Sequence, residues 1–269
     1  MAASRRGSGK VPLLQLLCRK FPELTREELY ARLLCGEVRV GSGIEKDPKA
    51  LVNPAADISF VFRRYVSRGG EKLESAFKNL QFPVSGKIFI DAGSSTGGFT
   101  HFLLLHGARA VHAVDVGYNQ LDYRLRNDPR VIVHERTNIQ SLSSLDPGPH
   151  AAVGDLSFRS LRGVVGHILS LTQEEWGVFL LKPQFEITDP AEDFCGVVHD
   201  AATLKRTLQS TLLSLAEESI RTEAMCAAGI RGRKGNQEYM VLLRRDGSGT
   251  VQERSGRVMH LVHDILTEP

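Results

Sequence analysis

Residues 88–100 read IFIDAGSSTGGFT, and this stretch decides the fold. An apolar run ends in an acid, Asp91, and a glycine-rich turn leads into a second apolar segment. A buried strand, a tight turn and a helix in this order begin a βαβ unit, whose ligands bind beyond the carboxyl ends of the strands. A dinucleotide requires G-x-G-x-x-G and a phosphate loop requires Gly-Lys-Ser/Thr, and both patterns are absent. Asp91 instead favours a ligand with an ammonium group.

From about residue 63 onward, apolar runs alternate with helical patterns, which predicts a parallel sheet with right-handed crossovers. Asp200 is the expected N-cap of one strong helix, whose apolar face carries leucines at 204, 208, 212 and 215. The last two strands are close enough in sequence to form an antiparallel hairpin at a sheet edge. The expected fold class is α/β, with a Rossmann-like sheet of about seven strands at 87–91, 110–116, 131–135, 151–155, 177–182, 222–228 and 238–244.

Residues 1–62 form a separate block with the pattern helix, helix, short strands. Leucines 13, 14, 16 and 17 recur at helical spacing, and Thr25 with Glu28 matches a capping box for a second helix. Gly36 is a plausible helix stop, and Val38 and Val40 alternate as in a strand. Around residues 31–40 the block resembles the small alpha-L RNA-binding fold. The alternative is a packing module without a ligand.

Composition gives few constraints, since 42% hydrophobic and 24% charged residues are ordinary for a globular protein. The net charge is only +3, but basic residues concentrate near the start. A local basic face can bind phosphates even in a nearly neutral chain, although a solvated surface explains the same pattern. The candidates for RNA binding are Arg32, Arg39, Arg64 and Arg68.

The four cysteines, at positions 18, 35, 195 and 226, have neither zinc-ligand spacing nor a disulfide pattern. We therefore expect reduced thiols, no metal site and a cytoplasmic location. Residues 4–18 imitate an export signal, but the apolar run is short and Arg19 and Lys20 follow at once, so an amphipathic helix is expected. No run approaches the roughly 18 apolar residues of a transmembrane helix, so stable membrane insertion is not expected.

Three features indicate where a cofactor binds. The first is the loop after Asp91, in which Gly93 can adopt positive φ, while Gly97 and Gly98 leave room for a ligand. The second is Asp115, which ends the next strand and can bind two ribose hydroxyls or, alternatively, cap a helix. The third is the segment after the third strand, where adenine is expected. The candidate cofactor residues are Asp91, Gly93, Ser94, Gly97, Gly98, Phe99, Asp115, Thr137 and Asn138.

Four charged residues form a candidate catalytic set. Asp155 and Lys182 end the fourth and fifth strands, on the sheet edge that the cofactor loop also occupies. A lysine that closes a hydrophobic strand is costly unless it has a partner or a function. Lys72 lies near the start of a helix before the sheet, and Glu238 enters the last strand. Taken singly, Lys72 could lie on a solvated helix face and Glu238 in a surface ion pair.

In order, these residues resemble the Lys-Asp-Lys-Glu tetrad of RNA 2′-O-methyltransferases. The cofactor loop resembles that of the FtsJ-like enzymes. Together with the motifs SRGG (67–70), DVGY (115–118), ERTN (135–138) and DLSF (155–158), they resemble the TlyA (hemolysin A) family. The resemblance implies an alpha-L RNA-binding domain at 1–62, joined to an S-adenosylmethionine-dependent methyltransferase domain at 63–269. It also implies 2′-O-methylation of cytidine in ribosomal RNA or ribosomal subunits.

Two other functions compete with an enzyme. The family name suggests a membrane-active protein, which needs an insertion segment that is not visible. A non-catalytic RNA-binding protein on the same fold is expected to have lost the tetrad or the glycine loop, and the chain has both. Residues 184–200, which follow Lys182 directly, are either a lid over the substrate or a long connection.

Overall fold

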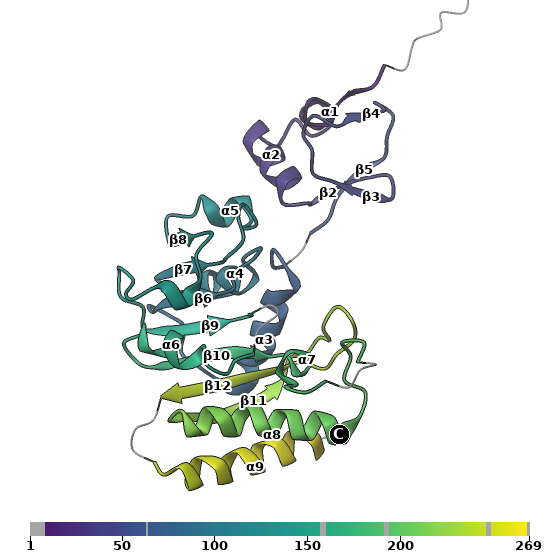
Figure 1. Cartoon of the computed structure of the whole chain (residues 1–269). Coiled ribbons are helices and arrows are strands. Elements are labelled where there is room, and N and C mark those ends of the chain that lie inside the picture. The colour runs from purple at the N-terminus through teal and green to yellow at the C-terminus, as the bar shows by residue number, and fades with distance from the viewer. Residues whose placement is uncertain (1–8, 63, 157–159, 191–193, 246–248, 268–269) are drawn as a thin grey trace, which may run out of the picture.

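The computed structural model describes residues 9–62, 64–156, 160–190, 194–245 and 249–267. It contains a small N-terminal block and a larger α/β domain, which lie end to end (Figure 1). In the described part of the chain, no helix is both long enough and apolar enough to cross a bilayer. Arg63 and, from the fourth family motif, Ser157 and Phe158 lie outside the described residues.

The N-terminal block forms around leucines from two helices. Leu13, Leu17, Leu29 and Leu33 are completely buried and pack with Val38 of the central strand. The capping box is present, since the Thr25 side chain accepts a hydrogen bond from the Glu28 amide while the Glu28 carboxylate accepts one from the Thr25 amide. The elements are β1 (Val11–Pro12), α1 (Leu13–Lys20), α2 (Arg26–Leu34), β2 (Val38–Val40), β3 (Gly43–Glu45), β4 (Leu51–Val52) and β5 (Ile58–Phe60).

The predicted order of helix, helix and short strands is confirmed for this block, but the predicted start of the first helix is wrong. The helix α2 ends at Leu34, and Gly36 follows with φ of 67°, as a helix stop requires. The strands β3, β2 and β5 form an antiparallel sheet in that order. The first helix begins only at Leu13, because Val11 and Pro12 form the strand β1, which pairs with β4.

The larger domain contains the predicted seven-stranded sheet, in the order β11-β12-β10-β9-β6-β7-β8. The five strands from β10 to β8 in this order are parallel. The strand β12 pairs antiparallel with both β10 and the edge strand β11. The strands are β6 (Ile88–Ala92), β7 (Ala110–Val114), β8 (Val131–His134), β9 (Ala151–Gly154), β10 (Trp176–Leu181), β11 (Ile220–Ala227) and β12 (Tyr239–Arg245).

Helices cover both faces of this sheet (Figure 1). Alternate residues along each strand point to opposite faces, so Phe89 packs with α3 and α4 while Ile90 packs with α6, α8 and α9. Asp200 caps α8 through the amides of Ala202 and Thr203, as predicted. The helices are α3 (Arg68–Leu80), α4 (Gly98–Leu105), α5 (Tyr123–Arg126), α6 (Val165–Ser170), α7 (Pro183–Glu186), α8 (Ala201–Glu217) and α9 (Val251–Thr267), with a 3-10 turn at Ile139–Ser141.

Candidate active site

The carboxyl ends of β6, β9 and β10 meet at one edge of the sheet, and the predicted site residues gather there. These three strands are adjacent and parallel, so Asp91, Asp155 and Lys182 necessarily occupy the same edge. The glycine loop after β6 lies directly on the next strand end. A Cβ atom on Gly93 would lie 2.8 Å from the carbonyl oxygen of Asp155. The cofactor loop and the catalytic set therefore form one continuous site.

Lys182 is fixed by two partners. The residue is 9% exposed, and its ammonium nitrogen lies 2.5 Å from Oδ1 of Asp155. It also donates a hydrogen bond to the carbonyl oxygen of Leu156, over 2.9 Å. An ammonium group has three N–H donors, so at least one remains for another acceptor even if the ion pair with Asp155 uses a second. The ring of Phe185 lies beside the ammonium, 5.8 Å from it at the centroid.

Lys72 and Glu238 form a second ion pair at the same edge. The ammonium nitrogen of Lys72 lies 2.5 Å from Oε2 of Glu238, and the two residues are 8% and 3% exposed. The readings of Lys72 on a solvated helix face and of Glu238 at the surface are therefore wrong. Burial of such a pair is costly unless each charge keeps its partner. The structure thus places the four predicted catalytic residues at one sheet edge as two ion pairs, of which Lys72–Glu238 is buried and Lys182–Asp155 leaves the carboxylate 27% exposed.

Asp91 is the acid with the most unusual environment. It is 1% exposed, and its Oδ2 accepts hydrogen bonds from the amide and the hydroxyl of Thr100, at 2.9 and 2.6 Å. Its Oδ1 is buried and has no partner among the described residues. Burial raises the pKa of Asp91 to about 7, the bonds from Thr100 oppose this, and the charges of Asp155 and Asp115 add to it.

A buried carboxylate oxygen without a partner fits a cationic ligand. An ammonium group placed at Oδ1 of Asp91 would supply the missing donor and offset the cost of burial. S-adenosylmethionine carries such a group, so the residues present fit the cofactor that the sequence resemblance implies. Thr100, which orients the carboxylate, was not predicted from the sequence.

Asp115 lies beyond the next strand, as predicted, and its helix-cap reading is wrong. Its two carboxylate oxygens accept hydrogen bonds from the amides of Ser95, at 2.8 Å, and Gly117, at 2.6 Å. Ser95 belongs to the glycine loop, so Asp115 ties that loop to the end of β7. Each oxygen retains a second lone pair for a hydroxyl donor. The apolar side chain of Val116, next in sequence, is 74% exposed and was not predicted as a site residue.

The glycines of the loop are explained largely by protein packing. A Cβ on Gly97, whose φ is 90°, would lie 2.3 Å from the Leu125 side chain. On Gly98 it would lie 2.2 Å from the Ser67 hydroxyl, because the start of α3 crosses the start of α4 there. The space on the Cβ side of both residues is therefore occupied by the protein, and packing alone requires glycine at both positions.

The remaining predicted cofactor residues differ in accessibility. Phe99 is 3% exposed and belongs to the hydrophobic core, and Ser94 is also buried. The Thr137 hydroxyl donates to the carbonyl of Glu135, and Asn138 caps the following turn by accepting from the Gln140 amide. These two side chains thus have local structural partners in addition to any ligand.

Of the predicted RNA-binding arginines, Arg39 is exposed on β2, whereas the others have partners within the chain. Arg32 lies 3.5 Å from Glu37 and packs over Phe60 and Phe62. Arg64 pairs with Glu74 at 2.6 Å, and Arg68 donates to the carbonyl of Arg231.

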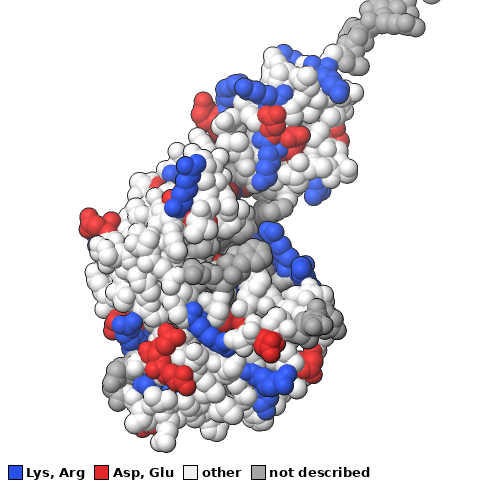
Figure 2. Space-filling view, viewed as in Figure 1, with Lys and Arg blue, Asp and Glu red and all other residues white. Residues whose placement is uncertain are grey.

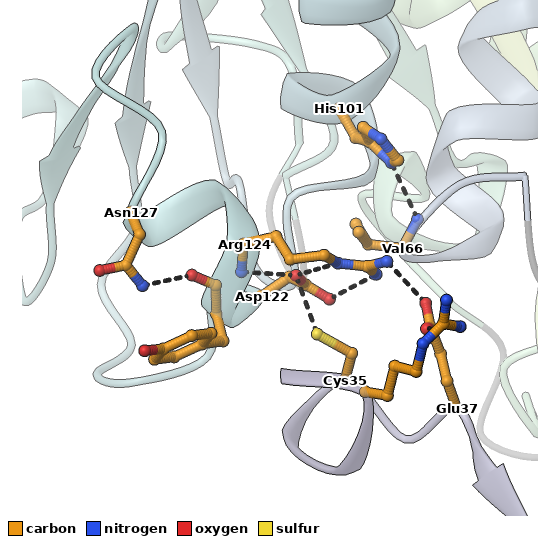
Figure 3. A network of polar contacts seen from close by, with 9 residues as sticks. Cys35, Glu37, Val66, His101, Asp122, Arg124 and Asn127 are labelled. Carbon is orange, nitrogen blue, oxygen red and sulfur yellow. Dashed lines mark hydrogen bonds and ion pairs between the residues drawn. The ribbon is translucent and has the colours of Figure 1, made fainter. Parts of the chain in front are cut away.

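A second polar network joins the two blocks, and sequence analysis did not predict it (Figure 3). Arg124 of α5 binds both carboxylate oxygens of Asp122 and lies 2.7 Å from Glu37 of the N-terminal block. The Cys35 thiol donates to Asp122 over 3.2 Å. Burial raises the pKa of Cys35 to about 11, and the hydrogen bond to Asp122 adds to the effect. We refer to Cys35, Glu37, Asp122 and Arg124 as the docking network.

The segment after Lys182 begins as the short helix α7, which had not been predicted. Glu186 is 2% exposed and accepts hydrogen bonds from the Ser160 hydroxyl, at 2.5 Å, and the Leu161 amide, at 2.8 Å. Further along, the Asn236 side chain holds the backbone of Gly196 and Val198. Residues 191–193 lie outside the described residues, and the choice between lid and connection stays a prediction.

Comparison with known proteins assigns a family to this arrangement. Residues 65–245 match the FtsJ-like methyltransferase family model. "Hemolysin A" of Brachyspira hyodysenteriae is 39% identical over 66% of this chain and 75% of its own length. The "16S/23S rRNA (cytidine-2'-O)-methyltransferase TlyA" of Mycobacterium tuberculosis is 36% identical over 82% of this chain and 84% of its own length. A solved structure from Streptococcus thermophilus, provisionally assigned as a hemolysin, has a TM-score of 0.67 and 28% identity, covering 97% of this chain and 100% of its own.

Proposed function

The chain belongs to the FtsJ-like methyltransferase family, and we propose that it methylates the 2′-hydroxyl of a cytidine in ribosomal RNA, with S-adenosylmethionine as the methyl donor. The observation that carries the proposal is the contact of two buried lysines with carboxylates beside the glycine loop. The Mycobacterium tuberculosis relative is named for this activity, and it is 36% identical to this chain over most of both chains. We infer a cytoplasmic location, because the proposed substrate is ribosomal RNA.

The cofactor supplies an electrophilic methyl group on a positively charged sulfur. Asp91 would hold its ammonium group through the unpartnered Oδ1, and Asp115 would bind its ribose hydroxyls. Gly93, Ser94, Gly97 and Gly98 would shape the loop between these acids, and Thr137 and Asn138 would lie near the adenine. The exposed side chain of Val116 is available to cover one face of that base.

Lys182 would act on the nucleophile. A ribose hydroxyl is a poor nucleophile, and transfer requires its oxygen to be held in line with the methyl group and its proton to be removed. The third N–H of the Lys182 ammonium can bind that oxygen, while Asp155 and the Leu156 carbonyl fix the direction of the side chain. Lys72, oriented by Glu238, would hold the ribose from the other side. To accept the hydroxyl proton instead, Lys182 would have to be present as the neutral amine, and its substitution with arginine, which cannot act as a base, separates that role from positioning.

Residues 1–62 would form an RNA-binding domain that increases affinity without taking part in the chemistry, and residues 63–269 would form the catalytic domain. The helix–Gly36–strand arrangement and the exposed Arg39 support this division. A surface cation that contacts phosphate strengthens binding in a salt-dependent way. Arg39→Ala is therefore expected to weaken RNA binding and leave cofactor affinity unchanged.

The proposed function is tested by mapping 2′-O-methylation in ribosomal RNA from cells with and without the gene. One or more cytidines are expected to lose the modification, and purified protein is expected to restore it on ribosomal subunits from the deleted strain. Restoration by Lys182→Ala at the wild-type rate, or an unchanged methylation map, would refute the proposal.

A further inference from the structure

The loop between β11 and β12 carries a group of cations that none of the roles above uses. Residues 231–235 read Arg-Gly-Arg-Lys-Gly, and Arg231, Arg233 and Lys234 are all exposed. Among the described residues, no carboxylate forms an ion pair with Arg233 or Lys234. Like charges on neighbouring residues repel one another, so an anionic partner would stabilise this loop.

The loop is a defined structure beside the candidate active site. Its backbone turns back on itself, with the Gly235 amide donating to Gly232 and the Gly232 amide donating to Asn236, both over 2.9 Å. A Cβ on Gly232 would lie 2.5 Å from Oε1 of Glu238, so the loop packs on that carboxylate.

Two further contacts brace the loop. The buried side chain of Asn236 binds both Gly196 and Val198, which belong to the segment after Lys182. The guanidinium of Arg68 donates to the carbonyl of Arg231. A loop fixed at several points can present its cations in a set direction with little further ordering on binding.

The position of the loop in the sheet excludes the cofactor as the anion it binds. The loop precedes β12, whereas Asp91 lies near the end of β6 and Asp115 follows β7, and the strands β10 and β9 lie between β12 and β6. Lys234 precedes Glu238 by four residues, so their Cα atoms lie no more than about 14 Å apart even for an extended chain. The cations therefore belong to the side of the site where the RNA ribose would lie.

Nucleic-acid chemistry then identifies the anion. The ribose that carries the reacting hydroxyl is linked to a phosphate on each side, so phosphates necessarily lie within a few ångströms of it. On the face shown in Figure 2, Lys and Arg side chains border the hollow below the N-terminal block. We propose that Arg233 and Lys234 bind the RNA phosphates that flank the ribose to be methylated. This inference rests on the proposed function, because it takes the ribose to lie at Glu238 and Lys182.

The test compares two double variants with the same change of charge. Arg233→Ala/Lys234→Ala removes the proposed contacts, and Lys205→Ala/Arg206→Ala removes two exposed cations from α8 as a control. Binding of ribosomal RNA is measured over a range of salt concentrations without cofactor. Loss of two phosphate contacts is expected to reduce the slope of log affinity against log salt by about 1.4, at about 0.7 per phosphate of a single strand. The control is expected to keep the wild-type slope.

Kinetics and a second substitution complete the test. The Arg233/Lys234 variant is expected to raise the KM for RNA several-fold while the kcat and the cofactor affinity stay near wild type. The charge-free variant R233Q/K234Q must reproduce the alanine result, and the charge-preserving variant R233K/K234R must restore the slope. A wild-type slope for the alanine or glutamine variant, or an equal loss in the control, would overturn the inference. Failure of the proposed function would appear differently, as absence of RNA methylation by the unaltered protein.

Discussion

Two networks of paired charges, one at the proposed tetrad and one at the docking network, differ in the cation they use. The tetrad pairs lysine with carboxylate, and each ammonium contacts fewer acceptors among the described residues than the three N–H donors it carries. In the docking network, each nitrogen of the Arg124 guanidinium already has a carboxylate partner, from Asp122 or Glu37. A permanently charged guanidinium that faces carboxylates with all three of its nitrogens is suited to hold two elements together, although it has five N–H donors in all. Ion pairs therefore do not mark a catalytic site by themselves, and what distinguishes the tetrad is its position at the sheet edge beside the glycine loop.

Of the substitutions in the two networks, replacement of Lys182 is expected to have the largest effect on methyl transfer. Lys182→Ala is expected to lose methyl transfer by at least about 10²-fold, the lower end of typical general-base assistance. Lys182→Arg is expected to fail as well, because its planar fork does not match a point ammonium and it cannot act as a base. Single-turnover methylation of ribosomal subunits with labelled cofactor measures both. Arg124→Lys, the reverse exchange in the docking network, is the matched control and should keep most activity.

Calorimetry must show that the Lys182 variants still bind S-adenosylmethionine. Appreciable activity of Lys182→Arg would assign the lysine a purely electrostatic positioning role. Near-native turnover by Lys182→Ala would remove the tetrad mechanism altogether.

Asp91 sharpens the comparison, because it is a buried carboxylate with no cation at all among the described residues. We expect Asp91→Ala to weaken cofactor binding by at least about tenfold, which corresponds to about 1.4 kcal/mol. Since the pKa of Asp91 is about 7, the wild-type affinity should rise as the pH is raised from 6 to 8 and the carboxylate becomes charged. Titration calorimetry at several pH values measures both effects. An affinity that Asp91→Ala leaves unchanged would exclude Asp91 from the cofactor site.

Stability should change in the opposite direction to binding at the same residue. The pKa of Asp91 is higher in the folded protein than its ordinary value of 3.8, so ionisation of this group opposes folding. The stability that the protein gains by keeping Asp91 protonated is complete below about pH 4, and it is lost as the pH rises through about 7. Asp91→Asn, which can still accept from Thr100, is thus expected to raise the melting temperature of cofactor-free protein at pH 8, by about 2–4 °C per kcal/mol. A larger gain at pH 5 than at pH 8 would contradict this explanation.

The smallest effect is expected in the docking network, with Cys35 as its reporter. The raised pKa of Cys35 keeps its thiol protonated at neutral pH, so alkylation should be slow compared with the exposed Cys195. Arg124→Ala removes the link to Glu37 and is expected to speed Cys35 alkylation several-fold, while Cys195 is unaffected. Mass spectrometry of the labelled peptides over time measures both rates. Equal rates for Cys35 in the variant and the wild type would show that Arg124 does not hold the two blocks together.

Local patterns predicted most elements of the fold, because each depends on residues close in sequence. The capping box at Thr25, the stop at Gly36 and the cap at Asp200 are all present. All seven strands of the large sheet were predicted to within two residues at either end. The strand at Val11–Pro12 and the helix α9 were not predicted. The strand needs its partner β4, and the only buried apolar side chains of α9 are Val258 and Val262, which is a weak pattern.

The site was predicted in part for the same reason. Asp91, Asp155 and Lys182 end strands, and strand ends of a parallel sheet share an edge, so their proximity follows from local patterns. The contact between Lys72 and Glu238 joins residues 166 positions apart and was not predicted, because the family resemblance placed both residues in the tetrad without pairing them. Thr100, Val116 and the cations at 231–234 carry no motif, and only their positions in the folded chain identify them.

The sequence by itself determined the order of the elements, the sheet and the acid at the end of each central strand, because strand, turn and helix preferences act over a few residues. Only the tertiary structure decided which charges are paired. It left Oδ1 of Asp91 without a partner among the described residues, placed Glu238 against Lys72, and filled the space beside Gly97 and Gly98 with protein. It also joined Cys35 to Asp122 across 87 residues. Burial and pairing depend on which distant segments come into contact, and those contacts set both the cost of each charge and its freedom to bind a substrate.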